Sequence, residues 1–188
     1  MASNSRIQLE QFLKTLDVSG NVLDIGGSQN PVKGRTKSWN ATQYTISDIE
    51  TPHGEKQKAD FVFDLNKKNL FGKRKYDVIF CLEVMEYIWN PVEAMNNIYK
   101  LLEEGGTAYI SFHWLYGLHN PKGEDCLRYS KNAIAKLCEK FQKIEFFARP
   151  TTKDGRRFLE QFYRVEGMRL DYTDQETYQE GYIVKLTR

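Results

Sequence analysis

The sequence predicts an α/β fold in which one domain is built around a doubly wound sheet of seven strands. Two patterns lead to this prediction. Short apolar runs that suit buried strands alternate with segments whose apolar residues recur at helical spacing. Most of the expected strands also end in an acidic residue or a turn, as they do where a parallel sheet meets a ligand. With 188 residues, of which 40% are hydrophobic, the chain can bury a sizeable core.

The first half of the chain is expected to hold one helix and four strands. Apolar residues at helical spacing from Ile7 to Leu16 predict a helix over residues 5–16, and a turn is expected at 17–21. The strands are expected at four places, which are residues 21–25, 42–48, 61–64 and 76–82. The fourth strand is apolar enough to be buried on both faces of a sheet.

The helix that follows the fourth strand has the clearest boundary signals. Asn90 can cap it, Pro91 suits its first position and Glu93 stands where a capping-box acid belongs. Gly105 and Gly106 are expected to end it. The remaining elements are expected to be a strand at 107–112, a long loop at 113–129, a helix capped by Ser130, a strand at 143–148, a short helix within 151–180 and a strand at 181–186.

The chain is interpreted as a single domain over residues 1–188. Residues 1–20 would form an N-terminal helix and turn, 21–148 a cofactor-binding core, and 149–188 a substrate-side segment with the last strand. The three cysteines have no metal-ligand spacing, and we expect no metal site. Their odd number, with no apolar leader at the start, favours the reducing cytoplasm. No run approaches the roughly 18 apolar residues of a membrane-spanning helix, so no membrane partner is expected.

The positive and negative charges of the chain are nearly balanced. The formal net charge is +2, which does not call for nucleic acid. Small basic clusters at 67–68, 73–75 and 156–157 are interpreted as solvated faces or turn flanks. Nucleic acid therefore remains a less favoured partner, and the oligomeric state is left open.

The most informative segment runs from Val22 to Pro31, where an apolar strand opens into two glycines. Glycine lets the backbone take positive φ and lets a ligand approach closely. A dinucleotide site would need Gly-x-Gly-x-x-Gly and a helix start that holds a pyrophosphate. Here the third glycine is missing and Pro31 interrupts that helix start. Asp24 beside the turn would repel a pyrophosphate and would suit a cationic or amine-bearing ligand.

Five segments occur in a characteristic order, namely Val-Leu-Asp-Ile-Gly-Gly at 22–27, Ile-Ser-Asp at 46–48, Asp-Leu at 64–65, a strand and turn at 76–88, and Leu-Leu-Glu-Glu-Gly-Gly-Thr at 101–107. In this order they resemble class I S-adenosylmethionine-dependent methyltransferases. The resemblance implies a Rossmann-like sheet, mostly parallel with an antiparallel last strand. It also implies S-adenosylmethionine as the cofactor and S-adenosylhomocysteine as the product. The chain departs from the usual family pattern at Ser28, Asn30 and Tyr87.

The same resemblance implies roles for the residues at the strand ends. Asp48 would accept hydrogen bonds from the two ribose hydroxyls, and Asp64 with Leu65 would contact the adenine. The implied cofactor-binding residues are Asp24, Gly26, Gly27, Ser28, Asp48, Asp64, Leu65, Cys81, Leu82 and Glu83. Two alternatives stay open, because Asp24 could be a turn acid and Asp64 could cap the turn before Asn66.

The loop from residue 113 to 130 is the expected acceptor side of the site. His113 is the candidate general base, with hydrogen bonding inside the loop as the alternative. Arg128 would either clamp an anionic group or pair with Asp125. The candidate substrate-binding residues are Tyr116, His119, Arg128 and Tyr129. The run Glu-Asp-x-Leu-Arg-Tyr-Ser at 124–130 resembles a loop of methyltransferases in sugar and surface-polysaccharide pathways.

These observations predict an enzyme that methylates a small polar acceptor, a sugar or related metabolite, at oxygen. Two alternatives remain. One is methylation of RNA, DNA or protein, and the other is a non-catalytic, methyltransferase-like regulatory subunit. An NAD-dependent oxidoreductase is disfavoured, because Pro31 stands where a phosphate-binding helix would begin.

Overall fold

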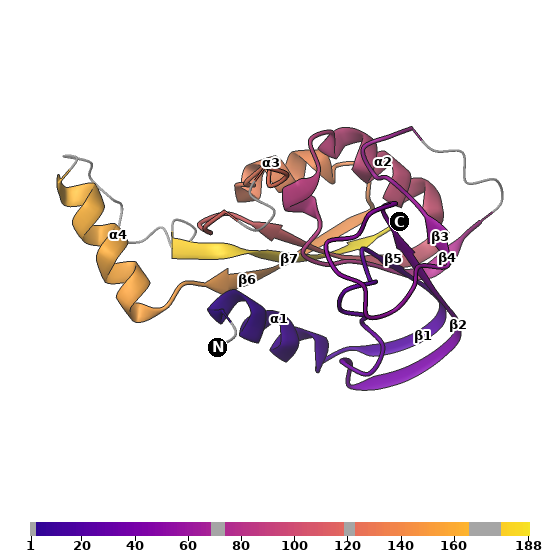
Figure 1. The fold of residues 1–188 in the computed structure, drawn as a ribbon. Helices are drawn as coiled ribbons and strands as arrows, with labels where there is room; N and C mark the ends of the chain where they lie inside the picture. Colours follow the sequence, from indigo (N-terminus) through magenta and orange to yellow (C-terminus); the bar gives the residue numbers. More distant parts are fainter. Residues whose placement is uncertain (1–2, 69–73, 119–122, 166–177) are drawn as a thin grey trace.

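A computed structural model describes residues 3–68, 74–118, 123–165 and 178–188 of the chain. The strands form one seven-stranded sheet in the order β3-β2-β1-β4-β5-β7-β6 (Figure 1). Their bounds are β1 (Asp17–Ile25), β2 (Ser38–Asp48), β3 (Phe61–Val62), β4 (Tyr76–Cys81), β5 (Leu102–His113), β6 (Lys143–Pro150) and β7 (Gln179–Thr187). Strand β7 is antiparallel to both of its neighbours, and the pairings among β1 to β5 are parallel. The predicted fold class is therefore confirmed.

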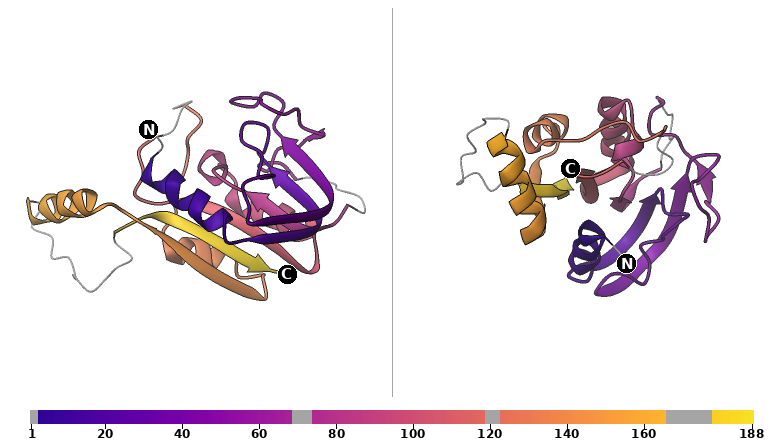
Figure 2. Two further views of the ribbon diagram at one scale, coloured as in Figure 1. Left: turned by 90° about the horizontal axis from the view of Figure 1, so that it is seen from below. Right: turned by 60° about the vertical axis from the view of Figure 1, so that its left-hand side comes forward.

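The helices cover both faces of this sheet. They are α1 (Asn4–Leu13), α2 (Pro91–Leu101), α3 (Lys131–Leu137) and α4 (Lys153–Val165), with a short 3-10 turn, η1 (Met85–Tyr87). Helices α2 and α3 lie on one face, where Met95 and Ile134 enter the larger core cluster. Helix α1 lies on the other face and buries Leu9 and Leu13 in a second cluster. Helix α4 extends away from the body of the molecule (Figure 2).

The helix caps agree with the sequence. The Asn90 side chain accepts a hydrogen bond from the backbone N–H of Glu93, and Pro91 occupies the first turn of α2. The Ser130 side chain caps α3 by accepting from the N–H of Ala133 at 3.3 Å. Such caps satisfy backbone donors that have no partner within the helix. Both helix starts are thus set by local side-chain chemistry.

The turn predicted at 17–21 is wrong, because β1 already begins at Asp17. Residues 17–20 pair in parallel with the start of β2, and the register shifts between Gly20 and Asn21. The Gly-Asn signal therefore marks an irregularity within a strand. Val18 is buried there, and its packing with α1 favours the strand over a turn.

The expected end of α2 at Gly105 and Gly106 is also wrong. The helix ends at Leu101 and β5 begins at Leu102. The two glycines lie inside β5, where the pairing with β4 jumps from Tyr76–Leu102 to Val78–Thr107. They accommodate an irregularity in the ladder, a common role of glycine in strands.

The remaining boundaries differ by a few residues from the prediction, and the expected helix within 151–180 is α4. Among the described residues, no helix has the length and apolar character needed to cross a membrane. The parallel topology brings the carboxyl ends of β1 to β5 to one edge of the sheet. The predicted acids and turns accordingly gather at this edge.

Candidate functional site

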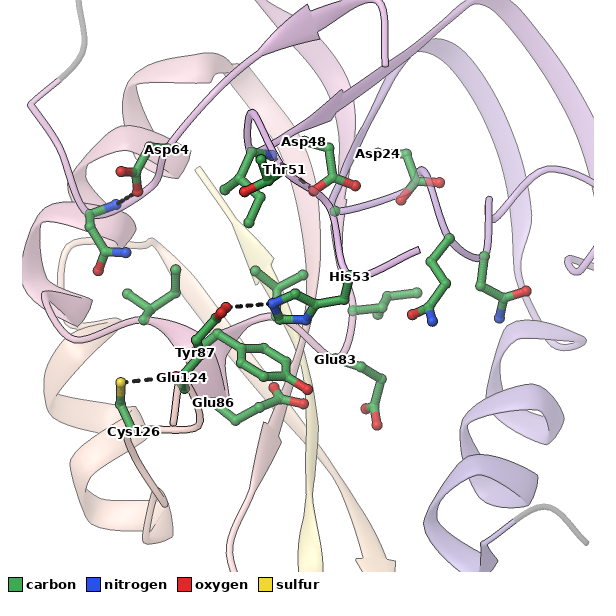
Figure 3. Close-up of a pocket in the computed structure, with 18 of the residues that line it drawn as sticks. Asp24, Asp48, Thr51, His53, Asp64, Glu83, Glu86, Tyr87, Glu124 and Cys126 are labelled. Atoms are coloured by element: carbon green, nitrogen blue, oxygen red, sulfur yellow. Dashed lines mark hydrogen bonds and ion pairs between the residues drawn. The ribbon is translucent and has the colours of Figure 1, made fainter. Parts of the chain in front are cut away.

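A cavity of about 1080 Å³ lies at the carboxyl edge of the sheet (Figure 3). It is lined from the ends of four strands, β1 to β4, by α1 and by the loop after β5. Seven residues predicted from the sequence line it, and these are Asp24, Gly26, Asp48, Asp64, Leu82, Glu83 and Tyr116. Clefts beyond the carboxyl ends of parallel strands are the usual ligand sites of such sheets.

The turn after β1 requires glycine at Gly26. Its φ is +75°, and a Cβ atom there would lie 2.4 Å from Cγ2 of Val84. Its N–H donates to the carbonyl of Ser47 at 2.7 Å, which fastens the turn to the end of β2. At Gly27, a Cβ would meet Cγ of Asp24 at 2.6 Å. The backbone is therefore kept close to the cavity wall, where a side chain would not fit.

Asp24 is buried beneath this turn. Its Oδ2 accepts hydrogen bonds from the N–H of Val32 and from the hydroxyl of Tyr44, each at 2.7 Å. Burial raises the pKa of Asp24 from 3.8 to about 6, although both hydrogen bonds oppose the rise. The carboxylate thus holds the loop after β1 in place, as a turn acid would, while one side of the residue faces the cavity.

Asp48 ends β2 and keeps acceptor capacity for a ligand. Its Oδ2 accepts from the N–H of Ser28 at 3.1 Å, and its Oδ1 accepts from the N–H of Ile49 at 2.9 Å. A carboxylate has about four lone-pair sites, so roughly two remain. Because Asp48 also lines the cavity, it can receive a pair of hydroxyl donors.

Asp64 lies at the opposite end of the cavity. Its Oδ1 accepts from the N–H of Asn66 at 2.9 Å, and its other oxygen lies 3.2 Å from Nζ of Lys67. The capping alternative is thus observed, and the residue still lines the cavity. Leu65 is buried in the core instead. Three exposed apolar side chains also line the cavity, namely Ile49, Val62 and Trp89. They form an apolar wall against which a flat ring could pack.

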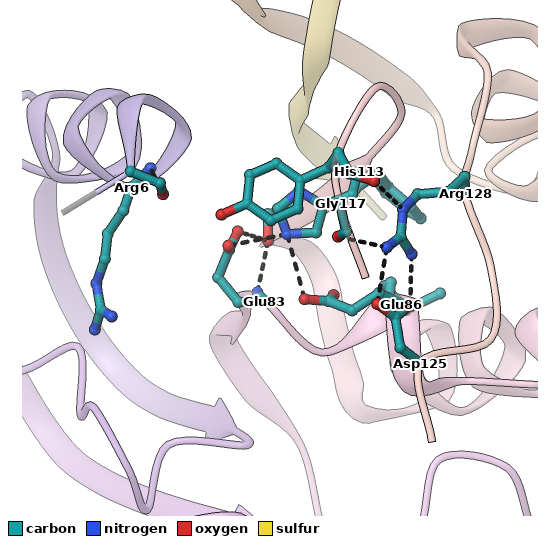
Figure 4. Close-up of polar contacts among 12 residues, drawn as sticks. Arg6, Glu83, Glu86, His113, Gly117, Asp125 and Arg128 are labelled. Atoms are coloured by element: carbon teal, nitrogen blue, oxygen red, sulfur yellow. Dashed lines mark hydrogen bonds and ion pairs between the residues drawn. The ribbon is translucent and has the colours of Figure 1, made fainter. Parts of the chain in front are cut away.

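A cluster of charged side chains adjoins the cavity, and Figure 4 shows its members Glu83, Glu86 and His113. Glu83 has a φ of +57° directly after β4, and Ser111 Oγ accepts from its backbone N–H at 2.6 Å. Its Oε1 accepts from Arg149 Nη1 at 2.8 Å and its Oε2 lies 3.0 Å from His113 Nε2. Burial alone would raise the pKa of Glu83, but the His113 hydrogen bond and the Arg149 charge hold it well below its usual range.

His113, the predicted general base, belongs to this cluster. Its imidazole is fully buried, stacks on Tyr116 with ring centroids 4.3 Å apart, and has Nε2 3.3 Å from Oε1 of Glu86. Burial alone would lower the pKa of His113, but Glu83 and Glu86 raise it to about 9. The two carboxylates therefore favour the protonated form of the imidazole. The imidazole does not line the cavity itself, but it contacts three residues that do, which are Glu83, Glu86 and Tyr116.

The donor atoms of Glu83, Glu86 and His113 lie within 4.8 Å of one another, a spacing that a metal ion could use. The structure also shows another way of balancing these charges. Arg149 and protonated His113 match the two carboxylates one for one. Buried charges require such pairing, because an unpaired charge in the interior is costly.

The other predicted acceptor-side residues mainly hold the loop together. All five N–H groups of Arg128 are used, by the carboxylate of Asp125 and by the carbonyls of Tyr116, Gly117 and Leu127. The pairing with Asp125 that the sequence left open is therefore present. Tyr129 is buried and donates to the carbonyl of Met85 at 2.9 Å. Neither side chain lines the cavity, and His119 lies outside the described residues.

Three further predicted residues lie behind the cavity wall. Gly27, Ser28 and Cys81 do not line the cavity, although the N–H of Ser28 orients Asp48. Burial raises the pKa of the Cys81 thiol far above its ordinary value, as expected for a core cysteine. These residues therefore support the site from beneath.

Several lining residues were missed by the sequence reasoning. Arg6 from α1 and Arg35 from the loop after β1 place two cations beside Asn30. Glu10 anchors Arg35 by an ion pair of 2.6 Å. His53 and Glu124 both line the cavity and are hydrogen-bonded to each other, with 2.6 Å between Nε2 and Oε2. None of these residues stands in a recognisable motif, because each reaches the site from a helix or loop whose placement depends on tertiary contacts.

Comparison with known proteins agrees with this geometry. A family model described as a methyltransferase domain matches residues 5–151, which is most of the chain. The chain belongs to this methyltransferase family. The predicted class I S-adenosylmethionine-dependent methyltransferase, with S-adenosylmethionine as its cofactor, is confirmed. No curated protein sequence matches the chain.

Solved structures share the fold of this methyltransferase at low sequence identity. An S-adenosylmethionine-dependent methyltransferase from Mesorhizobium loti matches with a TM-score of 0.61 at 13% identity, covering 98% of each chain. The N-methyltransferase NodS from Bradyrhizobium japonicum matches at 0.56 and 14% identity, covering 96% of this chain and 93% of its own. Phosphoethanolamine N-methyltransferase 2 from Haemonchus contortus, solved with S-adenosylmethionine, matches at 0.58 and 13%, covering 98% of this chain and 52% of its own.

The residues at the cavity fit the cofactor. The sulfonium and ammonium groups of S-adenosylmethionine suit a wall rich in carboxylates, and the molecule has no phosphate to be repelled. The approach at Gly26, the spare acceptor sites of Asp48 and the apolar wall near Asp64 each match a part of it. The lining of the cavity is therefore compatible with this cofactor.

Proposed function

We propose that this methyltransferase transfers a methyl group to a hydroxyl of a small polar acceptor, a sugar or a related metabolite. The observation that carries the proposal is the shape and lining of the cavity. It continues from the cofactor-side acids to a wall of polar and aromatic groups from His53, Tyr87, Tyr116 and Glu124. Its volume of about 1080 Å³ is large enough for the cofactor and a small second molecule.

In this proposal the cofactor lies along the edge of the sheet. Asp48 accepts from the ribose hydroxyls, the wall near Asp64 receives the adenine, and the Gly26 turn supports the methionine part. Arg6 and Arg35 offer cations for its carboxylate. S-Adenosylmethionine supplies an activated methyl group on sulfur, so the protein mainly positions the acceptor and removes its proton.

On the acceptor side, Tyr116 faces the cavity and Arg128 holds the loop that carries it. His113 supports Glu83 from behind. Direct contact between His113 and an acceptor would require Tyr116 to move, because the two rings are stacked. We assign the enzyme to the cytoplasm, since its cysteines Cys81, Cys126 and Cys138 are free thiols.

Titration calorimetry with S-adenosylhomocysteine tests the cofactor site. Asp48→Ala should weaken binding by about 1.5–3 kcal/mol, roughly 10- to 150-fold, because hydrogen bonds to a charged group are lost. Asp60→Ala is the matched control. Asp60 accepts from the N–H of Ile46 on the same strand at 2.7 Å but does not line the cavity, so binding should be unchanged. Equal affinity of wild type and Asp48→Ala would refute the ribose role.

Transfer of a tritium-labelled methyl group tests the acceptor. The probes are a panel of monosaccharides and a polar low-molecular-weight cell extract, and we expect label in a small-molecule fraction. Label found in RNA, DNA or protein instead would favour the macromolecular alternative. A protein that does not bind the cofactor would be a non-catalytic subunit.

A further inference from the structure

The pair formed by His53 and Glu124 stands apart from the charge cluster around His113. Oε2 of Glu124 lies 2.6 Å from Nε2 of His53, and both residues line the cavity. The rings of His53 and Tyr87 form a T-shaped contact, with centroids 4.7 Å apart. Figure 3 shows the imidazole projecting between the cofactor-side acids and the turn that carries Tyr87.

Both halves of the pair are held by backbone hydrogen bonds. The loop of His53 is fastened to the glycine turn, because the N–H groups of Lys56 and Gln57 donate to the carbonyl of Ser28 at 2.9 and 3.0 Å. The loop of Glu124 is fastened next to η1, where the N–H of Cys126 donates to the carbonyl of Glu86 at 2.7 Å. The pair therefore has a built position relative to the cofactor turn.

The hydrogen bond also determines which nitrogen of His53 can act. A carboxylate only accepts, so Nε2 carries the proton that is given to Glu124 and Nδ1 keeps its lone pair in the neutral ring. Among the residues that the structure describes, Nδ1 makes no hydrogen bond. The side chain of His53 is 22% exposed, whereas that of His113 is fully buried. A histidine oriented by a carboxylate and open to a cavity is the usual arrangement of a general base.

We propose that His53 is the general base of the methyl transfer and that Glu124 is its positioning residue. The inference rests on the proposed function, since it requires a hydroxyl acceptor. The acceptor oxygen forms a bond to the methyl carbon while the carbon–sulfur bond breaks with its electron pair going to sulfur. The hydroxyl proton moves to Nδ1 of His53 and is later released to water. The products are a methyl ether, S-adenosylhomocysteine and a proton.

The first test compares variants in the labelled-methyl assay with the monosaccharides and the polar extract. His53→Asn should lower kcat by about 100-fold or more, the range for loss of a general base, and should abolish the rise of kcat/KM with pH that follows deprotonation of the imidazole. Glu124→Gln should lower kcat roughly 10-fold. Glu55→Gln, which removes an exposed carboxylate from the same loop, should leave kcat unchanged. Calorimetry with S-adenosylhomocysteine should give the same affinity for all four proteins.

The second test does not depend on turnover. The chain has three histidines, so the ¹⁵N spectrum of His53 in the complex with S-adenosylhomocysteine can be assigned by comparison with His53→Asn. The neutral ring should be protonated at Nε2 in the wild type, because that N–H donates to the carboxylate of Glu124.

Two results would overturn the assignment while leaving the proposed function intact. These are wild-type turnover by His53→Asn, or a neutral ring of His53 that is protonated at Nδ1. A wild-type protein that binds S-adenosylhomocysteine but labels no small molecule would overturn both the proposed function and the base.

Discussion

Replacing Asp24 by Asn should make the protein more stable above neutral pH. The side chain is 3% exposed, and its burial raises the pKa from 3.8 to about 6. Asn keeps an oxygen that can accept from Val32 and Tyr44, but it carries no charge. The substitution therefore removes the cost of ionising a buried group and keeps its main hydrogen bonds.

The size of this effect follows from the difference between the two pKa values. Each pKa unit corresponds to about 1.36 kcal/mol, so ionised Asp24 costs the folded state about 3 kcal/mol. Below the unfolded pKa the carboxyl is protonated in both states and contributes nothing. As pH rises from 3.8 to about 6, the unfolded chain loses the proton first and stability falls. Above that range the cost is constant.

Urea unfolding followed by circular dichroism at about pH 4 and about pH 8 measures the effect. The gain in stability of Asp24→Asn over wild type, measured as a larger free energy of unfolding, should be about 2–3 kcal/mol greater at the higher pH than at the lower one. Tyr44→Phe should act in the opposite direction, because it removes a hydrogen bond that lowers the pKa of Asp24. An Asp24→Asn difference that is the same at both pH values would refute the argument.

Two further substitutions test the turn and the charge cluster. A non-glycine residue in the left-handed conformation costs ~1–2 kcal/mol of stability. Gly26→Ala should cost more than this, because its Cβ would also clash with Val84. It should also weaken the binding of S-adenosylhomocysteine, measured by calorimetry. Gly34 also has a positive φ, but no atom lies within 4 Å of the position of an added Cβ. Gly34→Ala should therefore lose stability only through backbone strain and should keep its affinity for S-adenosylhomocysteine. Arg149→Met should lower the free energy of unfolding by about 3–5 kcal/mol, because it leaves Glu83 without its guanidinium partner. Urea unfolding measures this loss, and an unchanged midpoint would contradict the proposed charge balance.

Local signals in the sequence were sufficient for most of the fold. The caps at Asn90 and Ser130 act within three residues, so a reader of the sequence can place both helix starts. The glycine turn and Asp48 could be predicted for a similar reason, because in a parallel sheet the strand ends lie at one edge. The turn signal at Gly20 was misleading, because the strand there depends on pairing with β2, which begins 18 residues later.

The sequence by itself determined the alternation of elements, the edge of the sheet where the cavity lies and the acids that line it. Only the tertiary structure decided which histidine meets the cavity. His113 is the last residue of β5, next to the predicted strand end, but Glu83, Glu86 and Arg149 enclose it and the two carboxylates raise its pKa. His53 faces the cavity and meets Glu124, 71 positions away along the chain. Burial and charge pairing set the exposure and protonation of a side chain, and they arise from neighbours that folding brings together.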